Sequence, residues 1–339
     1  MQTTSNTALA EEVRLTAGRI FSLIADELKD VETEFERQAR SNIQVIAYLG
    51  NHLRASGGKR VRPALTILSN YAVGGAAARY NSIRMATVME FLHTATLVHD
   101  DIIDNSMTRR NRPTINAQYG NQTAVLMGDW LYMSAFETSL AERSLPILDI
   151  LTAVTRQMTE GELLQLTLLG RMDVSEVQYL DVLRRKTAFL FSACCEVGAL
   201  LGDATDSQRI ALRDYGLNLG TAFQLIDDLL DFTGSDERLG KASGVDLLEG
   251  KLTLPLIYLL EGDEQARELM QTVIRDRGYR TVPRATLLAA VRKSGALERA
   301  TAKANHYAEA ARDCLDCLPE SEYCDSLRSI PTYVLERDN

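Results

Sequence analysis

Helical periodicity over long stretches is the feature that most constrains this fold. Apolar residues recur every three or four positions along two segments, at about 82–105 and about 207–233. The recurring positions are Met85, Val88, Met89, Leu92 and Thr96 in the first segment, and Leu212, Tyr215, Leu219, Phe223 and Ile226 in the second. Strand-like alternation is scarce, and no repeat or Pro/Gly/Ser-rich linker divides the chain. We therefore expect an all-α fold with one domain, residues 1–339, built as a bundle of long helices. Loops are expected where Gly, Ser and polar residues cluster, at 55–62, 105–114 and 234–250.

Charge and composition narrow the class of protein further. The chain is 45% apolar and 24% charged, with a net charge of −9. Such a surface repels nucleic acid and anionic lipid, so an anionic ligand needs a local basic cluster. No apolar run of about 18 residues occurs, and the N-terminus has no secretory signal pattern. We expect a cytoplasmic protein with no transmembrane segment and no nucleic-acid partner.

Five cysteines are present: Cys194, Cys195, Cys314, Cys317 and Cys324. An odd number without a secretory context favours reduced thiols. The C-x-x-C formed by Cys314 and Cys317 leaves a metal or redox role open, although no second pair accompanies it. We favour ordinary core or surface thiols.

Both long segments end in three aspartates at positions i, i+1 and i+4, surrounded by apolar residues: Asp100, Asp101 and Asp104 in the first, and Asp227, Asp228 and Asp231 in the second. On a helix, positions i and i+4 lie ~40° apart on one face. Like charges so close are unfavourable, and the helix dipole makes anions worse at a C-terminus. One such motif could be a solvated acidic turn. Two in apolar settings favour Mg²⁺, which binds one or two carboxylates together with substrate phosphates.

Basic residues that could neutralise phosphates lie near these motifs. A glycine-led loop at 57–63 carries three cations, and an arginine-rich loop follows the first aspartate motif. The glycine-led loop alone could be a solvated turn before a helix. The cationic and neighbouring candidates are Lys59, Arg60, Arg62, Arg109, Arg110, Arg112, Lys186, Thr187, Lys241 and Lys251. Without further information, His93 could equally be a buried core histidine, and Tyr132 and Phe136 core aromatics.

Taken together, these segments resemble the trans-isoprenyl diphosphate synthase (polyprenyl synthetase) family over nearly the full chain and in the family's order. The matching segments are GGKRVRP at 57–63, EFLHTATLVHDDIID at 90–104, RRNRPTIN at 109–116, GDWLYMSAF at 128–136, EGELLQL at 160–166, FQLIDDLLDFTG at 223–234 and LGKASGVDLLEGKLTLPLI at 239–257. The resemblance implies helices around a central substrate cavity, a homodimer, and condensation of isopentenyl diphosphate with an allylic diphosphate by Mg²⁺-assisted ionisation, condensation and elimination.

The resemblance also implies a role for individual residues. Those implied to act on magnesium, directly or in support, are Asp100, Asp104 and Asp227, then Asp101, Asp228 and Asp231. Those implied to hold isopentenyl diphosphate are Lys59, Arg62, His93 and Arg110. Those implied to hold the allylic diphosphate are Arg109, Lys186, Thr187, Gln224 and Lys241, with Lys251 as a further candidate. Lys186 and Lys241 are also expected to act in catalysis, and Arg337 to close over the homoallylic substrate.

Product length is predicted from side-chain size before the first aspartate motif. Short-chain family members resemble this chain except for bulky aromatics at the positions of Ala95 and Thr96. A tunnel beside a helix of roughly 36 Å, at ~1.5 Å per residue, suits a long, octaprenyl- to decaprenyl-sized product. Its floor is expected at Met89, Leu92 or Phe136. Alternatives are a short-chain (geranylgeranyl or farnesyl) synthase and a non-catalytic subunit of a heteromeric prenyltransferase. A class I terpene synthase is disfavoured because its second metal motif differs.

Overall fold

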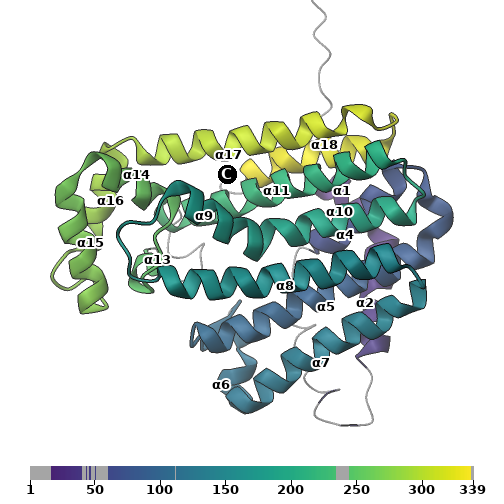
Figure 1. The fold of residues 1–339 in the computed structure, drawn as a ribbon, viewed down its shortest axis with the longest axis horizontal. Coiled ribbons are helices and arrows are strands. Elements are labelled where there is room, and N and C mark those ends of the chain that lie inside the picture. The colour runs from purple at the N-terminus through teal and green to yellow at the C-terminus, as the bar shows by residue number, and fades with distance from the viewer. Residues whose placement is uncertain are drawn as a thin grey trace, which may run out of the picture.

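The computed structural model describes residues 17–39, 60–110, 112–233 and 244–336, and the single residues 43, 46 and 50. Apart from one short hairpin, the regular structure in these ranges is helical (Figure 1). The sequence candidates Lys59, Lys241 and Arg337 lie outside the described residues.

The helices follow one another with short connections. Their bounds are α1 (Ala17–Ser22), α2 (Ala25–Gln38), α4 (Val61–Ala72), α5 (Arg79–Ile103), α6 (Ile115–Tyr119), α7 (Asn121–Ser139), α8 (Leu145–Leu168), α9 (Glu176–Leu183), α10 (Phe189–Leu201), α11 (Asp206–Thr233), α13 (Val245–Leu248), α14 (Leu254–Gly262), α15 (Glu264–Asp276), α16 (Arg284–Lys293), α17 (Ala296–Asp313) and α18 (Glu322–Leu335). Short 3₁₀ turns lie at η1 (Gly75–Ala78), η2 (Leu140–Glu142) and η4 (Cys314–Cys317), and a π-helical turn at η3 (Arg184–Ala188). The strands β1 (Thr108–Arg109) and β2 (Arg112–Pro113) pair antiparallel.

The predicted all-α bundle is confirmed. The two long segments are α5 and α11, whose bounds differ from the predicted ones by three residues or fewer. Helix α5 lies inside the bundle between α4 and α7, and its middle is buried on every side, including Phe91, Leu92 and Ala95. A helix hydrophobic all round belongs in a core. This burial anchors the middle of the helix whose last turn carries the first aspartate motif.

Helix α5 ends earlier than its apolar pattern predicts because of its backbone. Asn105 has φ +51°, the left-handed conformation that stops a helix. Its N–H donates to the carbonyl of Ile102, and the Ser106 N–H donates to that of Asp101. This Schellman pair satisfies carbonyls that would otherwise be unpaired at the helix end. The first aspartate motif is thereby fixed on the last turn.

Two of the expected loops contain regular structure. The loop expected at 105–114 contains the hairpin of β1 and β2, in which Arg109 pairs with Arg112. The expected loop at 234–250 contains α13 in its described part. Helix α4 begins at Val61, within the loop expected at 55–62, and Pro63 sits in its first turn, where a missing N–H costs little. Within the described ranges, no helix combines the length and hydropathy needed to cross a bilayer.

Candidate active site

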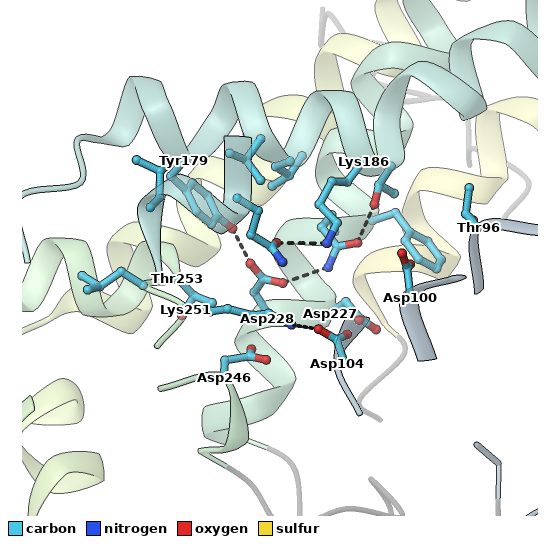
Figure 2. Close-up of a pocket in the computed structure, with 18 of the residues that line it drawn as sticks. Thr96, Asp100, Asp104, Tyr179, Lys186, Asp227, Asp228, Asp246, Lys251 and Thr253 are labelled. Carbon is cyan, nitrogen blue, oxygen red and sulfur yellow. Dashed lines mark hydrogen bonds and ion pairs between the residues drawn. The ribbon is translucent and has the colours of Figure 1, made fainter. Parts of the chain in front are cut away.

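Both aspartate motifs open onto one cavity of about 510 Å³. Helix α5 contributes Asp100 and Asp104, and α11 contributes Asp227 and Asp228. Figure 2 shows Asp104 and Asp227 reaching toward the same space from the two helices. Other predicted site residues that line this cavity are Arg62, His93, Arg109, Arg110, Lys186, Thr187, Gln224 and Lys251. Residues as far apart in the sequence as Arg62 and Lys251 therefore form a single site.

The remaining two aspartates, Asp101 and Asp231, do not line the cavity. Asp101 is buried and accepts hydrogen bonds from Arg109, with Nη2 2.9 Å and Nε 3.0 Å from its Oδ1. Such a charge-assisted pair fixes the arginine-rich hairpin against α5. Asp231 on α11 is 2% exposed and is not among the residues that line the cavity. Both therefore suit a supporting role rather than direct contact with a ligand in the cavity.

The cavity aspartates carry unfavourable charge. Burial, followed by the nearby Glu162 carboxylate, raises the pKa of Asp100 from 3.8 to about 7. Burial, followed by Asp246, raises the pKa of Asp228 to about 7 as well. Desolvation and like charges both disfavour the ionised form of a carboxyl group. A bound cation would remove this conflict, because it favours the ionised carboxylates.

Asp228 is held by a hydrogen-bond network. The Tyr179 hydroxyl on α9 donates to its Oδ2 at 2.6 Å, and Gln224 Nε2 donates to its Oδ1 at 2.9 Å. Thr187 Oγ1 in turn donates to Gln224 Oε1 at 2.8 Å (Figure 2). Both carboxylate oxygens are thus fixed, which leaves Asp104 and Asp227 as the more exposed carboxylates of the site. Lys251 Nζ lies 3.3 Å from Asp104 Oδ1 and 2.8 Å from Glu249 Oε2.

The π-helical turn η3 places two successive residues, Lys186 and Thr187, on the cavity wall. In an α-helix they would point about 100° apart, whereas a π turn inserts one extra residue and re-aims its neighbours. Lys186 Nζ pairs with Glu162 at 2.7 Å and donates to Gln165 Oε1 at 3.0 Å. Helix α8 can approach this turn because residue 161 is glycine. A Cβ on Gly161 would lie 2.7 Å from the Cβ of Arg185.

A second pocket of about 400 Å³ adjoins the first and shares Arg62, His93 and Arg110 with it. Burial lowers the pKa of both arginines, and burial together with these cations holds the pKa of His93 well below its usual value. The Arg62 guanidinium lies 4.9 Å from the ring centroid of Phe191, and its buried Nε has no acceptor among the described residues. An anion is the ligand that such a pocket favours.

The predicted product-length residues fall into two groups. Thr96 lines the main cavity, and its hydroxyl donates to the His93 carbonyl at 2.7 Å, so it presents no unsatisfied polar group. Ala95, Leu92 and Met89 are fully buried in the direction away from Asp100. Phe136 on α7 packs against the same core. Their effect on product length stays a prediction.

The cavity residues missed as individual candidates include Gln165, Tyr179 and Asp246, and Glu162 was missed as the ion-pair partner of Lys186. Glu162 and Gln165 stand three apart in the segment at 160–166, so their shared helix face was available as a signal. Asp246 lies between the two lysines of the segment at 239–257. Tyr179 gives no sequence signal, because its role depends on how α9 packs against α11.

The donor set fits a hard divalent cation. Carboxylates from two helices line one cavity, with cations placed around it. No three His, Cys, Asp or Glu side chains among the described residues stand close enough to hold one ion alone. This arrangement suits Mg²⁺, which typically keeps water and completes its shell with substrate phosphates.

Comparison with known proteins agrees with this geometry. The polyprenyl synthetase family matches residues 43–287. The chain is 38% identical over 325 residues to octaprenyl diphosphate synthase of Haemophilus influenzae, covering 96% of this chain and 98% of that protein. The crystal structure of a decaprenyl diphosphate synthase from Rhodobacter capsulatus has a TM-score of 0.89 at 36% identity, covering 96% and 100% of the two chains. That of a polyprenyl synthase from Caulobacter crescentus, complexed with calcium and isoprenyl diphosphate, has a TM-score of 0.89 at 34% identity, covering 96% and 99%. The chain belongs to the polyprenyl synthetase family.

Proposed function

We propose that this chain is a trans-polyprenyl diphosphate synthase that condenses isopentenyl diphosphate with an allylic diphosphate. The main support for this proposal is that two pockets adjoin one another. One is lined by the carboxylates Asp100, Asp104 and Asp227, and the other by Arg62, Arg110 and few acidic groups. The first suits a diphosphate that arrives with metal ions, and the second suits one bound by cations alone. Two diphosphate sites in contact are what a prenyl condensation needs.

Each residue has a distinct task in this reaction. Asp100, Asp104 and Asp227 would hold Mg²⁺, which when bound stabilises the charge of the departing diphosphate. Lys186 and Thr187 would hold the same allylic diphosphate from the opposite wall and orient it. Arg62, His93 and Arg110 would hold isopentenyl diphosphate with its double bond toward the allylic carbon. Apolar lining residues keep water from the carbocation, namely Leu97, Val182, Leu183 and Phe223.

A long product follows from the wall of the main cavity. Thr96 is the residue of the predicted size-limiting pair that lines it, and it is small. Two of the similar proteins named above are an octaprenyl and a decaprenyl diphosphate synthase. We infer a product of similar length. A short-chain synthase remains the alternative that product analysis must separate.

A homodimer is the proposed assembly. Helices α7 and α8 contact one another, and both carry large exposed apolar side chains. Leu126 is 69% exposed, Met133 62% and Leu163 60%. Exposed apolar residues grouped on neighbouring helices indicate a protein interface. Leu126→Glu should shift the mass measured by light scattering toward the monomer, and a wild-type monomer would refute the assignment.

Incubation with Mg²⁺, farnesyl diphosphate and labelled isopentenyl diphosphate tests the activity. We expect a ladder of dephosphorylated products that ends at a long polyprenol. Products that stop at three or four isoprene units would keep the reaction and refute the long product. No incorporation with any primer would favour a non-catalytic subunit instead. The cytoplasmic location and the absence of a nucleic-acid partner stay predictions.

A further inference from the structure

The cation-lined pocket contains a carboxylate that a diphosphate site does not obviously need. Glu90 on α5 is 6% exposed and lines this pocket with Arg60, Arg62 and Arg110. A buried carboxylate beside a bound diphosphate would repel it. Its presence therefore calls for a role other than contact with the ligand.

Glu90 is committed to one of the three arginines. Arg60 Nη1 donates to Glu90 Oε1, while Arg60 Nε donates to Glu32 Oε1 on α2. The Arg60 side chain is only 15% exposed, so both ion pairs are largely shielded from solvent. One guanidinium thus ties α2, α5 and the start of α4 together.

The backbone at Arg60 shows that this tie has a cost. Arg60 precedes α4 with φ +49° and ψ +36°, a left-handed conformation that non-glycine residues seldom adopt. Such a conformation persists where surrounding contacts over-determine it. The two ion pairs supply those contacts. They fix the direction in which the chain enters α4, and Arg62 follows two residues later.

The three arginines differ in how their charge is met. Although burial alone would lower it, pairing with Glu90 and Glu32 raises the pKa of Arg60. Arg62 and Arg110 have lowered pKa values, chiefly because of burial, and no carboxylate in the described part of the chain is hydrogen-bonded to either. The charge of Arg60 is therefore neutralised within the protein by Glu32 and Glu90. The charges of Arg62 and Arg110 remain for an incoming anion.

We propose that Arg60 and Glu90 are positioning residues for the homoallylic substrate: their ion pair, anchored on Glu32, holds the chain entering α4 so that Arg62 faces the second pocket. This inference rests on the proposed function, because it assigns isopentenyl diphosphate to that pocket. It also separates the cations of the glycine-led loop into a structural one and a ligand-binding one. Arg60 does not contact the diphosphate.

The test compares three variants with a matched control. Glu90→Gln and Arg60→Met each break the pair, and Arg60→Met combined with Glu90→Leu replaces both partners with apolar groups. The control is Glu142→Gln, which breaks the ion pair between Arg84 of α5 and Glu142 of η2. That pair has a similar exposure (16% and 4% for the side chains) and lies outside both pockets.

For each variant the KM of isopentenyl diphosphate, the KM of the allylic substrate and kcat are measured. Metal-free titration calorimetry with isopentenyl diphosphate gives affinity without turnover. Each single variant should raise the isopentenyl diphosphate KM and Kd by about tenfold or more, because Arg60→Met leaves the buried Glu90 charge without Arg60 and Glu90→Gln leaves Arg60 held by Glu32 alone. The allylic KM should change less than about threefold. The double variant should bind better than either single variant, since apolar replacement of both partners is often nearly neutral.

Several outcomes would overturn the proposal. A double variant as poor as Arg60→Met would make Arg60 a direct ligand. Tighter binding by Glu90→Gln would show that Glu90 merely opposes the anion. An equal rise in both KM values, or the same effect in Glu142→Gln, would reduce the pair to general stability. A wild-type chain that incorporates no isopentenyl diphosphate would instead refute the proposed function.

Discussion

Replacing Asp100 by asparagine should stabilise the metal-free protein while it abolishes synthesis. Asp100 lies on the last turn of α5, and burial with the nearby Glu162 raises its pKa from 3.8 to about 7. At ~1.4 kcal/mol per pKa unit, its ionisation at pH 8 opposes folding by up to about 4 kcal/mol, and relaxation around the charge reduces this to about 2 kcal/mol. Asparagine keeps the shape and removes the charge.

The expected gain can be converted into a melting temperature. At ~2.1 cal/mol/K per residue, unfolding of the 339-residue chain has an entropy of about 0.7 kcal/mol/K. A gain of 2–4 kcal/mol therefore corresponds to about 3–6 °C at pH 8 with a chelator present. Differential scanning calorimetry measures this shift directly.

The pH dependence of unfolding independently tests whether Asp100→Asn stabilises the metal-free protein. The folded-state pKa of Asp100 lies above its unfolded value, so between about pH 4 and 7 the folded state holds a proton that the unfolded state releases. Wild-type stability must then fall as pH rises through this window. The advantage of Asp100→Asn should be small near pH 4.5 and complete above pH 7. With Mg²⁺ and inorganic diphosphate added, the wild type should become the more stable of the two proteins, because only it keeps the Asp100 carboxylate as a metal ligand.

A metal-free Asp100→Asn protein that is less stable than wild type at pH 8 would refute this reasoning. So would an advantage that does not depend on pH. The matched control is Asp149→Asn on α8, an exposed aspartate outside the cavity. Surface changes of this kind usually stay within about 0.5 kcal/mol.

Three further variants probe the walls of the cavity. Gly161→Ala places a Cβ 2.7 Å from the Cβ of Arg185, so stability should fall by about 1–3 kcal/mol and the allylic KM should rise; unchanged melting and kinetics would show that η3 yields freely. Tyr179→Phe removes the 2.6 Å donor to Asp228, which should lower kcat/KM by about tenfold or more and move the acid limb of its pH profile upward; a fixed profile would contradict the role of this hydroxyl. Thr96→Tyr should shorten the products seen by chromatography, and an unaltered ladder would place the prenyl tail along another wall.

Much of the fold was predictable because the signals are local. Periodicity alone located α5 and α11, since a buried helix repeats its apolar residues with the period of its own geometry. The all-α class and the membership of the polyprenyl synthetase family are confirmed. The paired aspartates were recognisable because their i, i+4 spacing places them on one face of a helix. Their convergence on a single cavity agrees with the prediction, although their tasks as metal ligands stay untested.

Other features depended on packing between distant segments. Nothing near Tyr179 in the sequence indicates that its hydroxyl meets Asp228, 49 residues later. Likewise the three cations of the glycine-led loop look equivalent in the sequence. Only the position of α2 and α5 around Arg60 shows that its charge is met by Glu32 and Glu90. Roles decided by tertiary contacts cannot be obtained from local patterns.

The π-helical turn has a consequence for how this chain can vary. Helix α9, η3 and α10 form one uninterrupted helical run from 176 to 201, and its register shifts by one residue inside η3. Losing one residue there would restore ordinary α-helical hydrogen bonds and remove a strained turn. It would also rotate α9 against α10 by about 100° and carry Tyr179 off Asp228. A one-residue deletion in η3 would therefore suit the helix itself but would disrupt the site. We expect this segment to vary by point substitution and not by a change in length.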